Sequence, residues 1–285
     1  MHLKEVLDNL YASRSLAHLA NDPLSFCHRY TDPADKEVVG LIASAFAYGN
    51  VKIILRNLEE IFAKMGPSPR AFVEKFEPDR GHTLFAGFRH RFNDGRDLTA
   101  LLLAARTMLE EADSISEFFL GCYDPEAEDI TLALSSFCAA ILSMDYTSVF
   151  GRGGVPADSY FPFFFPSPAA GSACKRLCMY LRWMVRPADG FDLGLWRGVS
   201  PAKLIIPVDA HIRRIGLYLG LTCRKQADWR MAREITASLR RLAPDDPVKY
   251  DFPLCHLGIS EGCAGHDRLR CNDCPIVELC KAPTI

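Results

Sequence analysis

The chain has 285 residues, of which 49% are hydrophobic, and its 33 Lys or Arg nearly balance its 35 Asp or Glu. This composition is typical of a globular protein with a large buried core, and it excludes a disordered or low-complexity chain. No run of 18 apolar residues occurs, and the charged N-terminus lacks the apolar segment of a signal peptide, so we expect no transmembrane helix and a cytoplasmic location. In a reducing compartment, the eleven cysteines indicate metal binding and buried thiols rather than disulfides.

Helical signals follow one another along the chain. Asp32 and Pro33 are typical of a helix N-terminus, and the apolar segment 38–48 follows them. Gly49 and Asn50 end this segment, after which apolar residues recur at helical spacing. The same signals predict further helices over residues 98–109, 130–144, 175–185, 210–219 and 229–242. No series of alternating strands is evident, so the predicted fold class is all-α.

The segment 148–170 is the least helical part of the sequence. It contains three glycines, four prolines and five aromatic residues between Tyr160 and Phe165. Because so many aromatic side chains would be costly to leave in water, we predict an extended crossover packed between two helical regions, and not a flexible linker.

The charged residues are unevenly distributed. Between Gly171 and Arg241 there are 14 Lys or Arg and five Asp or Glu, whereas the rest of the chain has 19 basic and 30 acidic residues. Such segregation is typical of a nucleic-acid-facing surface on an otherwise acidic protein. A solvated basic face without a partner would have the same pattern.

Four cysteines cluster near the C-terminus in the pattern C-x7-C-x2-C-x5-C: Cys263, Cys271, Cys274 and Cys280. Four converging thiolates suit a [4Fe–4S] cluster or a tetrahedral zinc ion. Structural zinc usually recruits two C-x2-C pairs, and this motif has one. We therefore predict a structural iron–sulfur cluster, with zinc as the alternative.

Two segments resemble a known superfamily. The tail LCHLGISEGCAGHDRLRCNDCPIVELC, residues 254–280, resembles the cluster loop of endonuclease III and the adenine glycosylases, with a first interval one residue longer. Residues 206–215, IPVDAHIRRI, resemble the V-D-x-H segment of the same helix-hairpin-helix glycosylase superfamily. The whole chain is similar to an uncharacterised bacterial family related to these enzymes, through residues 35–50, 171–177 and 181–186.

The resemblance implies a helix-hairpin-helix glycosylase-like bundle with a C-terminal [4Fe–4S] loop and an N-terminal helical extension. It also divides the chain. We expect an N-terminal helical region over 1–147, the crossover over 148–170, a glycosylase-like helical region over 171–260 and the cluster loop over 261–285.

Asp209 and Lys175 are the candidate catalytic residues that the resemblance implies. The superfamily's aspartate caps a helix and faces the base-binding pocket, where a fixed carboxylate stabilises the charge that develops as an N-glycosidic bond breaks. Capping alone is the alternative role for Asp209. In bifunctional members a lysine at the start of the helix after the hairpin attacks the sugar C1′ and forms a Schiff base. A phosphate contact is the alternative role for Lys175.

The sequence departs from endonuclease III in two ways. One hairpin glycine, Gly171, stands where that enzyme has two, and the separation of 34 positions from Lys175 to Asp209 is longer than in that enzyme. The longer interval is similar to that of the archaeal 8-oxoguanine glycosylases, which have an insertion after the helix that carries the lysine.

The expected partner is DNA, with RNA as an alternative. The hairpin and nearby arginines would bind its backbone: Gly171, Ser172, Arg176, Arg182, Arg186, Arg213 and Arg214. Arg182 and Arg186 are four residues apart on one predicted helix face, which suits a phosphate backbone. The resemblance thus implies a base-excision-repair N-glycosylase, with abasic-site lyase activity if Lys175 is the nucleophile. The alternative is a catalytically inactive protein that binds nucleic acid or senses lesions.

Aromatic residues offer further candidates. Trp183, Trp196 and the run 161–165 could stack on an extruded base, although core packing is the usual role of such side chains. The segment Phe88-Arg89-His90-Arg91-Phe92 mixes basic and aromatic residues, and it could face nucleic acid or simply carry ordinary surface side chains.

Overall fold

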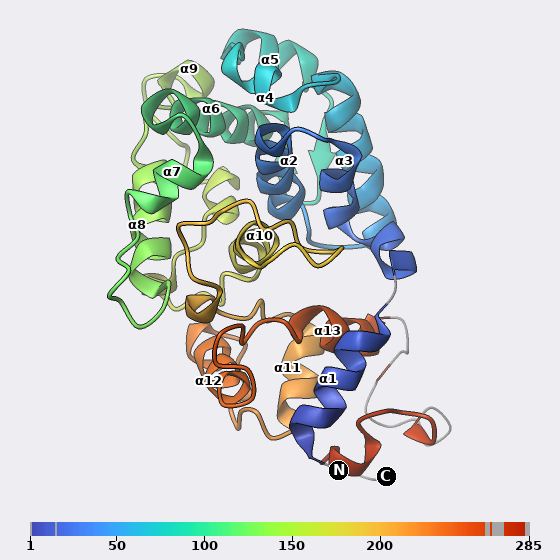
Figure 1. Ribbon diagram of the computed structural model, residues 1–285. Helices are drawn as coiled ribbons and strands as arrows, with labels where there is room; N and C mark the ends of the chain where they lie inside the picture. Colours follow the sequence, from blue (N-terminus) through green and yellow to red (C-terminus); the bar gives the residue numbers. More distant parts are fainter. Residues whose placement is uncertain (1, 15, 260–262, 264–270, 283–285) are drawn as a thin grey trace.

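The computed structural model describes residues 2–14, 16–259, 263 and 271–282, and helices dominate the described residues (Figure 1). The α-helices are α1 (Leu3–Ser13), α2 (Pro33–Ala45), α3 (Val51–Met65), α4 (Pro69–Glu74), α5 (Pro78–Leu84), α6 (Gly95–Ala112), α7 (Ile115–Leu120), α8 (Thr131–Leu142), α9 (Thr147–Phe150), α10 (Lys175–Val185), α11 (Ala210–Tyr218), α12 (Trp229–Arg240) and α13 (Asp251–Ile259). The 3₁₀ helices are η1 (Leu16–Asn21), η2 (Pro23–Arg29), η3 (Phe161–Phe164), η4 (Pro168–Ala170), η5 (Pro201–Lys203) and η6 (Val277–Leu279).

Strands make a minor contribution to the described residues. β1 (Arg89–His90) and β2 (Asn93–Asp94) pair antiparallel in a tight hairpin. The predicted all-α class is confirmed. None of the described helices combines the length and apolarity that a bilayer span requires.

Side-chain caps begin several helices where the sequence predicts them. Asp32 and Asn50 each accept a hydrogen bond from the backbone amide two residues further on, at 2.9 and 3.0 Å, and so begin α2 and α3. These bonds satisfy amides that have no partner within the helix. α10 has the predicted bounds. α6 starts earlier than predicted because Asp94 and Asp97 form a reciprocal capping box.

The helices form two groups with α10 between them (Figure 1). α2 to α9 make up one group, and α11, α12 and α13 make up the other together with α1. α10 packs against α2, while α1 and α11 both pack against α13. Asp8 of α1 accepts hydrogen bonds from Lys249 and Tyr250, at 2.8 Å each. The first helix therefore lies beside the C-terminal helices and apart from α2 to α9.

α2 and α10 approach each other closely at Gly40. A Cβ atom on this residue would lie 2.3 Å from Cε of Met184 and 3.1 Å from the ring of Tyr180. The absence of a side chain on Gly40 therefore allows the helices to pack at this distance. This contact matters for the site described below, because the turn after α2 and the start of α10 form part of its wall.

The crossover packs against the helices, as predicted. Phe161, Phe164 and Phe165 are buried, and the Phe161 ring centroid lies 4.6 Å from that of Tyr146. Phe163, in the same aromatic run, remains exposed. The burial of most of this run explains why the segment is not a flexible linker.

Candidate functional site

A cleft of about 480 Å³ lies where the two helix groups meet. Its walls come from residues 21–23, the turn between α2 and α3, one face of α10, and the N-terminal parts of α11 and α13. Lys175 and Asp209 both line it, although 34 residues separate them in the sequence. Apolar side chains that include Met179 and Phe252 contribute to the wall. The size and mixed lining suit a small organic ligand or one unit of a larger chain.

Asp209 is the N-cap residue of α11. Its Oδ1 accepts hydrogen bonds from the amides of His211 and Ile212, both at 2.8 Å, which fix the carboxylate at the helix N-terminus. The thiol of Cys255 donates to Oδ2, with Sγ at 3.4 Å. Burial raises the pKa of Cys255 well above its usual value, so this donor is a neutral thiol. The two hydrogen bonds from the α11 amides confirm the predicted capping role of Asp209.

Lys175 is the first residue of α10. Its Nζ donates to the carbonyl oxygen of Ala47, 3.3 Å away, just after the end of α2. The N-cap residue before it, Cys174, has a left-handed φ of 48° and makes no side-chain capping bond. The first amides of α10 therefore lack an N-cap acceptor, and they add positive potential to that of the lysine ammonium group.

Residues 171–174, where the resemblance places the hairpin, form a tight turn before α10. Gly171 has a φ of 78°, which glycine adopts without strain, and its carbonyl accepts from the amide of Trp229 at 3.1 Å. The Oγ of Ser172 accepts from the amide of Cys174 at 3.3 Å. The three-residue 3₁₀ helix η4 lies directly before this turn, and the α-helix α10 follows it.

Two buried charged residues also line the cleft. The guanidinium of Arg182 contacts the carboxylate of Asp251 through Nη1 and donates to Asp192 through Nε at 3.2 Å. Burial raises the pKa of Asp251 to about 6, although the charge of Arg182 opposes this shift. The pair is therefore a fixed internal part of the cleft wall.

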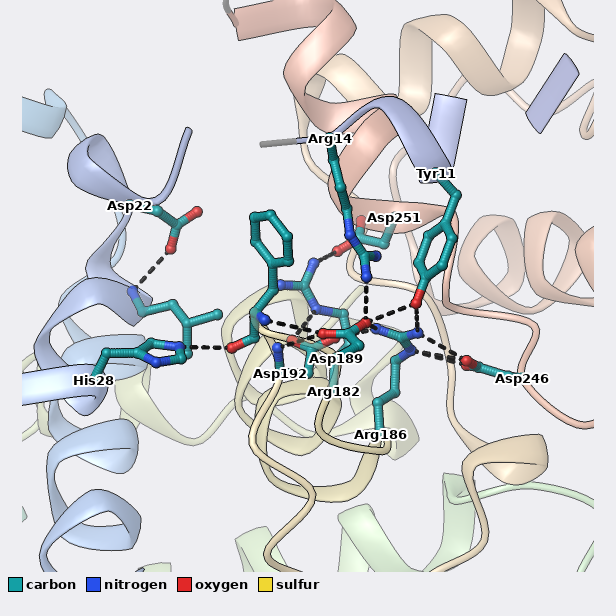
Figure 2. Close-up of polar contacts among 12 residues, drawn as sticks. Tyr11, Arg14, Asp22, His28, Arg182, Arg186, Asp189, Asp192, Asp246 and Asp251 are labelled. Atoms are coloured by element: carbon teal, nitrogen blue, oxygen red, sulfur yellow. Dashed lines mark hydrogen bonds and ion pairs between the residues drawn. The ribbon is translucent and has the colours of Figure 1, made fainter. Parts of the chain in front are cut away.

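The prediction that Arg182 and Arg186 follow a phosphate backbone is wrong. Their exposed fractions are 4% and 2%, and both belong to a buried ion-pair network around α10 (Figure 2). Arg186 donates to Asp246 through Nη2 at 2.8 Å and to Asp189 at 3.1 Å, and Arg14 at the end of α1 also donates to Asp189, at 2.8 Å. The spacing of four does place both arginines on one helix face, but that face points inward, toward acids of the loop after α10 and of the segment 246–251.

Arg176 is likewise buried, so its predicted contact with nucleic acid is wrong. Its Nη1 donates to the carbonyl of Ala45 at 2.7 Å, and its guanidinium lies 4.0 Å from the ring centroid of Phe163 and contacts that residue's carbonyl. Burial lowers the pKa of Arg176 to about 10. Its role in the fold is to tie the start of α10 to the end of α2.

The last two predicted arginines lie on α11. Arg213 is exposed and donates to the carbonyl of Lys225 at 3.0 Å. Nη2 of Arg214 lies 3.2 Å from Nδ1 of His211, while its Nε is buried without a partner among the described residues. Contact of these arginines, and of the turn at Gly171, with nucleic acid stays a prediction.

The basic excess between residues 171 and 241 is partly neutralised inside the fold. Acids outside that stretch pair with three of its arginines: Asp251 with Arg182, Asp246 with Arg186 and Asp129 with Arg233. The charge count in the sequence therefore overstates how basic this part of the surface is.

The four clustered cysteines are all part-exposed: Cys263, Cys271, Cys274 and Cys280. The amide of Cys274 donates to the carbonyl of Cys271 at 3.2 Å, which closes the C-x2-C turn. Four thiols are a suitable donor set for an iron–sulfur cluster or zinc. However, the described part of the chain contains no group of three or more His, Cys, Asp or Glu side chains arranged as a metal site. Most of 260–270 lies outside the described residues, and the cluster stays a prediction.

Sequence patterns do not identify two residues of the cleft wall. Tyr48 ends an apolar segment and therefore resembles a core residue, and Asp251 is an isolated acid at the start of α13. Cys255 has one signal, its position eight residues before the cysteine motif, which does not point to Asp209. These side chains converge only because α2, α10, α11 and α13 pack around one space.

The fold and the cleft together define an all-α protein with a lysine and an aspartate facing one cleft between two helix groups. Residues 22–260 match the family described as a protein of unknown function (DUF2400), and the chain belongs to this family. The matched range includes Lys175 and Asp209 and ends before Cys263. No curated protein matches the chain, and neither does any solved structure.

Proposed function

We propose that this protein is a DNA N-glycosylase that holds one extruded nucleotide in the cleft and breaks its glycosidic bond. The observation that carries the proposal is the joint lining of the cleft by Lys175 and Asp209, which belong to distant segments. The resemblance of residues 206–215 and 254–280 to helix-hairpin-helix glycosylases supports it. An extruded base is the form in which such enzymes reach their target atom.

Asp209 is suited to stabilising positive charge on a sugar. Two amides hold its Oδ1, and the neutral thiol of Cys255 on Oδ2 leaves the carboxylate charge in place. As the bond between C1′ and the base nitrogen breaks, the electron pair leaves with the base and the sugar becomes cationic. A carboxylate fixed beside C1′ stabilises that state, and an apolar wall strengthens the interaction by excluding water.

Lys175 supports the proposal in either of two roles. As a nucleophile, its neutral amine would form a bond to C1′ as the base leaves, and Asp209 would accept the proton that the amine releases. Ring opening would then give the Schiff base from which a lyase acts. As a phosphate ligand, the ammonium group would act together with the uncapped amides of α10.

The proposal includes a structural [4Fe–4S] cluster, with zinc as the alternative, held by the four clustered cysteines. The described C-terminal segment already contacts α11, because the amide of Lys281 donates to the carbonyl of Tyr218 at 2.7 Å. A cluster in this segment would hold it against the helix that Asp209 caps. All four ligands would come from protein, so its role would be to stabilise the fold.

Release of free base from a panel of lesion-containing oligonucleotides tests the proposal. Asp209→Asn keeps an oxygen that can cap α11 but removes the charge, so we expect base release to fall by roughly 100-fold or more. Asp228→Asn is the matched control, because Asp228 caps α12 and does not line the cleft. Full activity in Asp209→Asn would contradict the mechanism.

Borohydride trapping on abasic DNA separates the two roles of Lys175. Lys175→Arg keeps the positive charge but cannot form a Schiff base. If Lys175 is the nucleophile, the wild type gives a covalent adduct and Lys175→Arg gives none, although it still binds DNA. If Lys175 is a phosphate ligand, neither protein gives an adduct, and Lys175→Gln binds more weakly than Lys175→Arg.

A catalytically inactive lesion-binding protein is the second candidate function. The bond from Lys175 to the carbonyl of Ala47 favours it, because this bond occupies the amine within the fold. This candidate predicts preferential binding to lesion-containing DNA with no base release from any oligonucleotide in the panel. It also predicts that Asp209→Asn leaves the preference unchanged.

A further inference from the structure

Exposed apolar side chains gather beside the cleft. Large hydrophobic residues that stand exposed in the described structure include five from segments that adjoin it: Val51, Ile53, Phe92, Tyr160 and Phe163. Val51 lines the cleft itself. Phe163 contacts another cleft residue, since its ring centroid is 5.1 Å from that of Tyr48. At Val51 and Phe163 this apolar surface is therefore continuous with the cleft wall.

Phe92 and Tyr160 form a stacked pair on this surface. Their ring centroids are 5.1 Å apart with an interplanar angle of 20°, and the residues are 48% and 45% exposed. Phe92 lies in the turn between β1 and β2, whereas Tyr160 belongs to the crossover. The two flat rings thus come together from distant segments and remain open to solvent, where their burial by a ligand would be favourable. We call Phe92, Tyr160 and Phe163 the aromatic patch.

A buried asparagine holds the aromatic patch in place. Asn93 is fully buried, and its Nδ2 donates to the carbonyl of Tyr160 at 2.9 Å and to Oδ2 of Asp97 at 3.0 Å. The hydroxyl of Tyr48 donates to the carbonyl of His90 at 2.9 Å and also contacts Asn93. The same hydrogen bonds therefore connect the cleft wall, the β-hairpin and the crossover. A surface fixed in this way binds a ligand with little loss of conformational freedom.

Exposed basic side chains lie on α3 and in the β-hairpin that carries Phe92, and the Arg91 guanidinium lies 5.3 Å from the Phe92 ring centroid. Lys52, Arg56, Arg89 and Arg91 are exposed, and none of them pairs with a carboxylate among the described residues. Arg91 packs against the cleft residue Gly49, because a Cβ there would lie 2.9 Å from Cδ of the arginine. This arrangement combines flat aromatic faces with unneutralised positive charge, which is the surface chemistry that binds single-stranded nucleic acid.

We propose that the aromatic patch and these basic residues bind the unpaired strand that flanks the nucleotide in the cleft. The inference rests on the proposed function for the identity of that nucleotide. Bases would stack on Phe92, Tyr160 and Phe163, while Arg89 and Arg91 would neutralise phosphates. The substrate class that follows is single-stranded or locally unpaired nucleic acid, since stacking on these rings requires bases free of a partner strand.

Fluorescence anisotropy with a labelled, lesion-free 15-mer tests the inference on the full-length protein. We expect single strands to bind more tightly than the corresponding duplex. The double variant Phe92→Ala/Tyr160→Ala should weaken single-strand binding about tenfold or more, as loss of base stacking does. The matched control is Leu132→Ala/Leu142→Ala, which removes two exposed apolar side chains on α8 and should bind as the wild type does.

The salt dependence of binding tests the basic residues. Arg89→Gln/Arg91→Gln should reduce the slope of log affinity against log salt by about 1.4, or about 0.7 for each lost phosphate contact on a single strand. Lys75→Gln/Arg197→Gln removes two exposed charges elsewhere and should leave the slope unchanged. Thermal unfolding of each variant checks that the fold is retained.

The possible outcomes separate this inference from the glycosylase proposal. Wild-type binding by Phe92→Ala/Tyr160→Ala would overturn the inference, whether or not the protein releases bases. Tighter binding of duplex than of single strands would overturn it as well. Weaker binding by this variant, with wild-type binding by Leu132→Ala/Leu142→Ala, would support the strand-binding surface even if no oligonucleotide loses a base. A patch that mediates self-association instead would appear as a change in oligomeric state in Phe92→Ala/Tyr160→Ala, with no effect on the 15-mer.

Discussion

Sγ of Cys255 lies 3.4 Å from Oδ2 of Asp209, so a neutral, part-buried thiol from α13 faces the carboxylate that caps α11. Because burial raises the pKa of Cys255, little thiolate forms near neutral pH. We expect Cys255 to react with iodoacetamide at pH 8 far more slowly than the exposed Cys223. Peptide mass spectrometry of partially alkylated protein would measure the two rates. Labelling of Cys255 ahead of Cys223 would contradict the assignment of a neutral, protected thiol.

Asp209 has a structural role that can be separated from its chemical role. Asp209→Ala removes the acceptor for two α11 amides and should lower the free energy of unfolding by about 1 kcal/mol. Asp209→Asn keeps an acceptor for these amides and should lower the free energy of unfolding by less than about 0.5 kcal/mol. Urea unfolding followed by circular dichroism would measure both variants. Equal destabilisation would mean that the charge, and not the cap, holds α11.

Arg186 is the most extensively paired of the buried arginines. Its removal would leave Asp189, Asp192 and Asp246 without their shared cation, so we expect Arg186→Met to cost about 3–5 kcal/mol of unfolding free energy. Arg213→Met, on the exposed surface of α11, should change stability by less than about 0.5 kcal/mol. Denaturant titrations of the two variants give the comparison. A small effect at Arg186 would contradict the buried network.

Asp189 should make stability depend on acid pH. Burial alone would raise its pKa, but the hydrogen bond from Tyr11 and the charges of Arg186 and Arg14 outweigh burial and lower the pKa from 3.8 to about 2. The folded state therefore binds this proton less readily than the unfolded state. The stability contributed by Asp189 is complete above about pH 4 and is lost as the pH falls toward 2, with a magnitude of roughly 2 kcal/mol.

Asp189→Asn provides the control for this pH dependence. The difference in unfolding free energy between the wild type and this variant should narrow by roughly 2 kcal/mol from pH 5 to pH 2. Urea titrations at a series of pH values would follow it. Parallel curves for the two proteins would show that the pKa of Asp189 is the same in the folded and unfolded states.

Anaerobic purification tests the proposed cluster. We expect a brown protein with an absorbance band in the blue region and about four iron atoms per chain. Cys274→Ser should lose the colour and the iron, whereas Cys223→Ser, at an exposed cysteine outside the motif, should keep both. A colourless wild type with one zinc per chain would support the zinc alternative instead.

The sequence alone indicated several helix starts and, through the resemblance, the two candidate catalytic residues. The cap at Asp32, the break at Asn50 and the cap at Asp209 all follow from interactions within about four residues along the chain. Such interactions depend on local chemistry, which the sequence displays directly.

Tertiary structure decided which side chains the protein buries and which it presents. Arg182 and Arg186 have the spacing of a basic surface, yet both are internal. Their acidic partners are Asp189 and Asp192, shortly after α10, and Asp246 and Asp251, which follow Arg186 and Arg182 by 60 and 69 residues. Within one aromatic run, Phe161 is buried and Phe163 is exposed. Phe92 stacks on Tyr160, although the two residues are 68 positions apart in the sequence. Pairing and burial depend on contacts between distant segments, so the convergence of Lys175 and Asp209 on one cleft, and the contact of Phe163 with the cleft residue Tyr48, are properties of the packed helices.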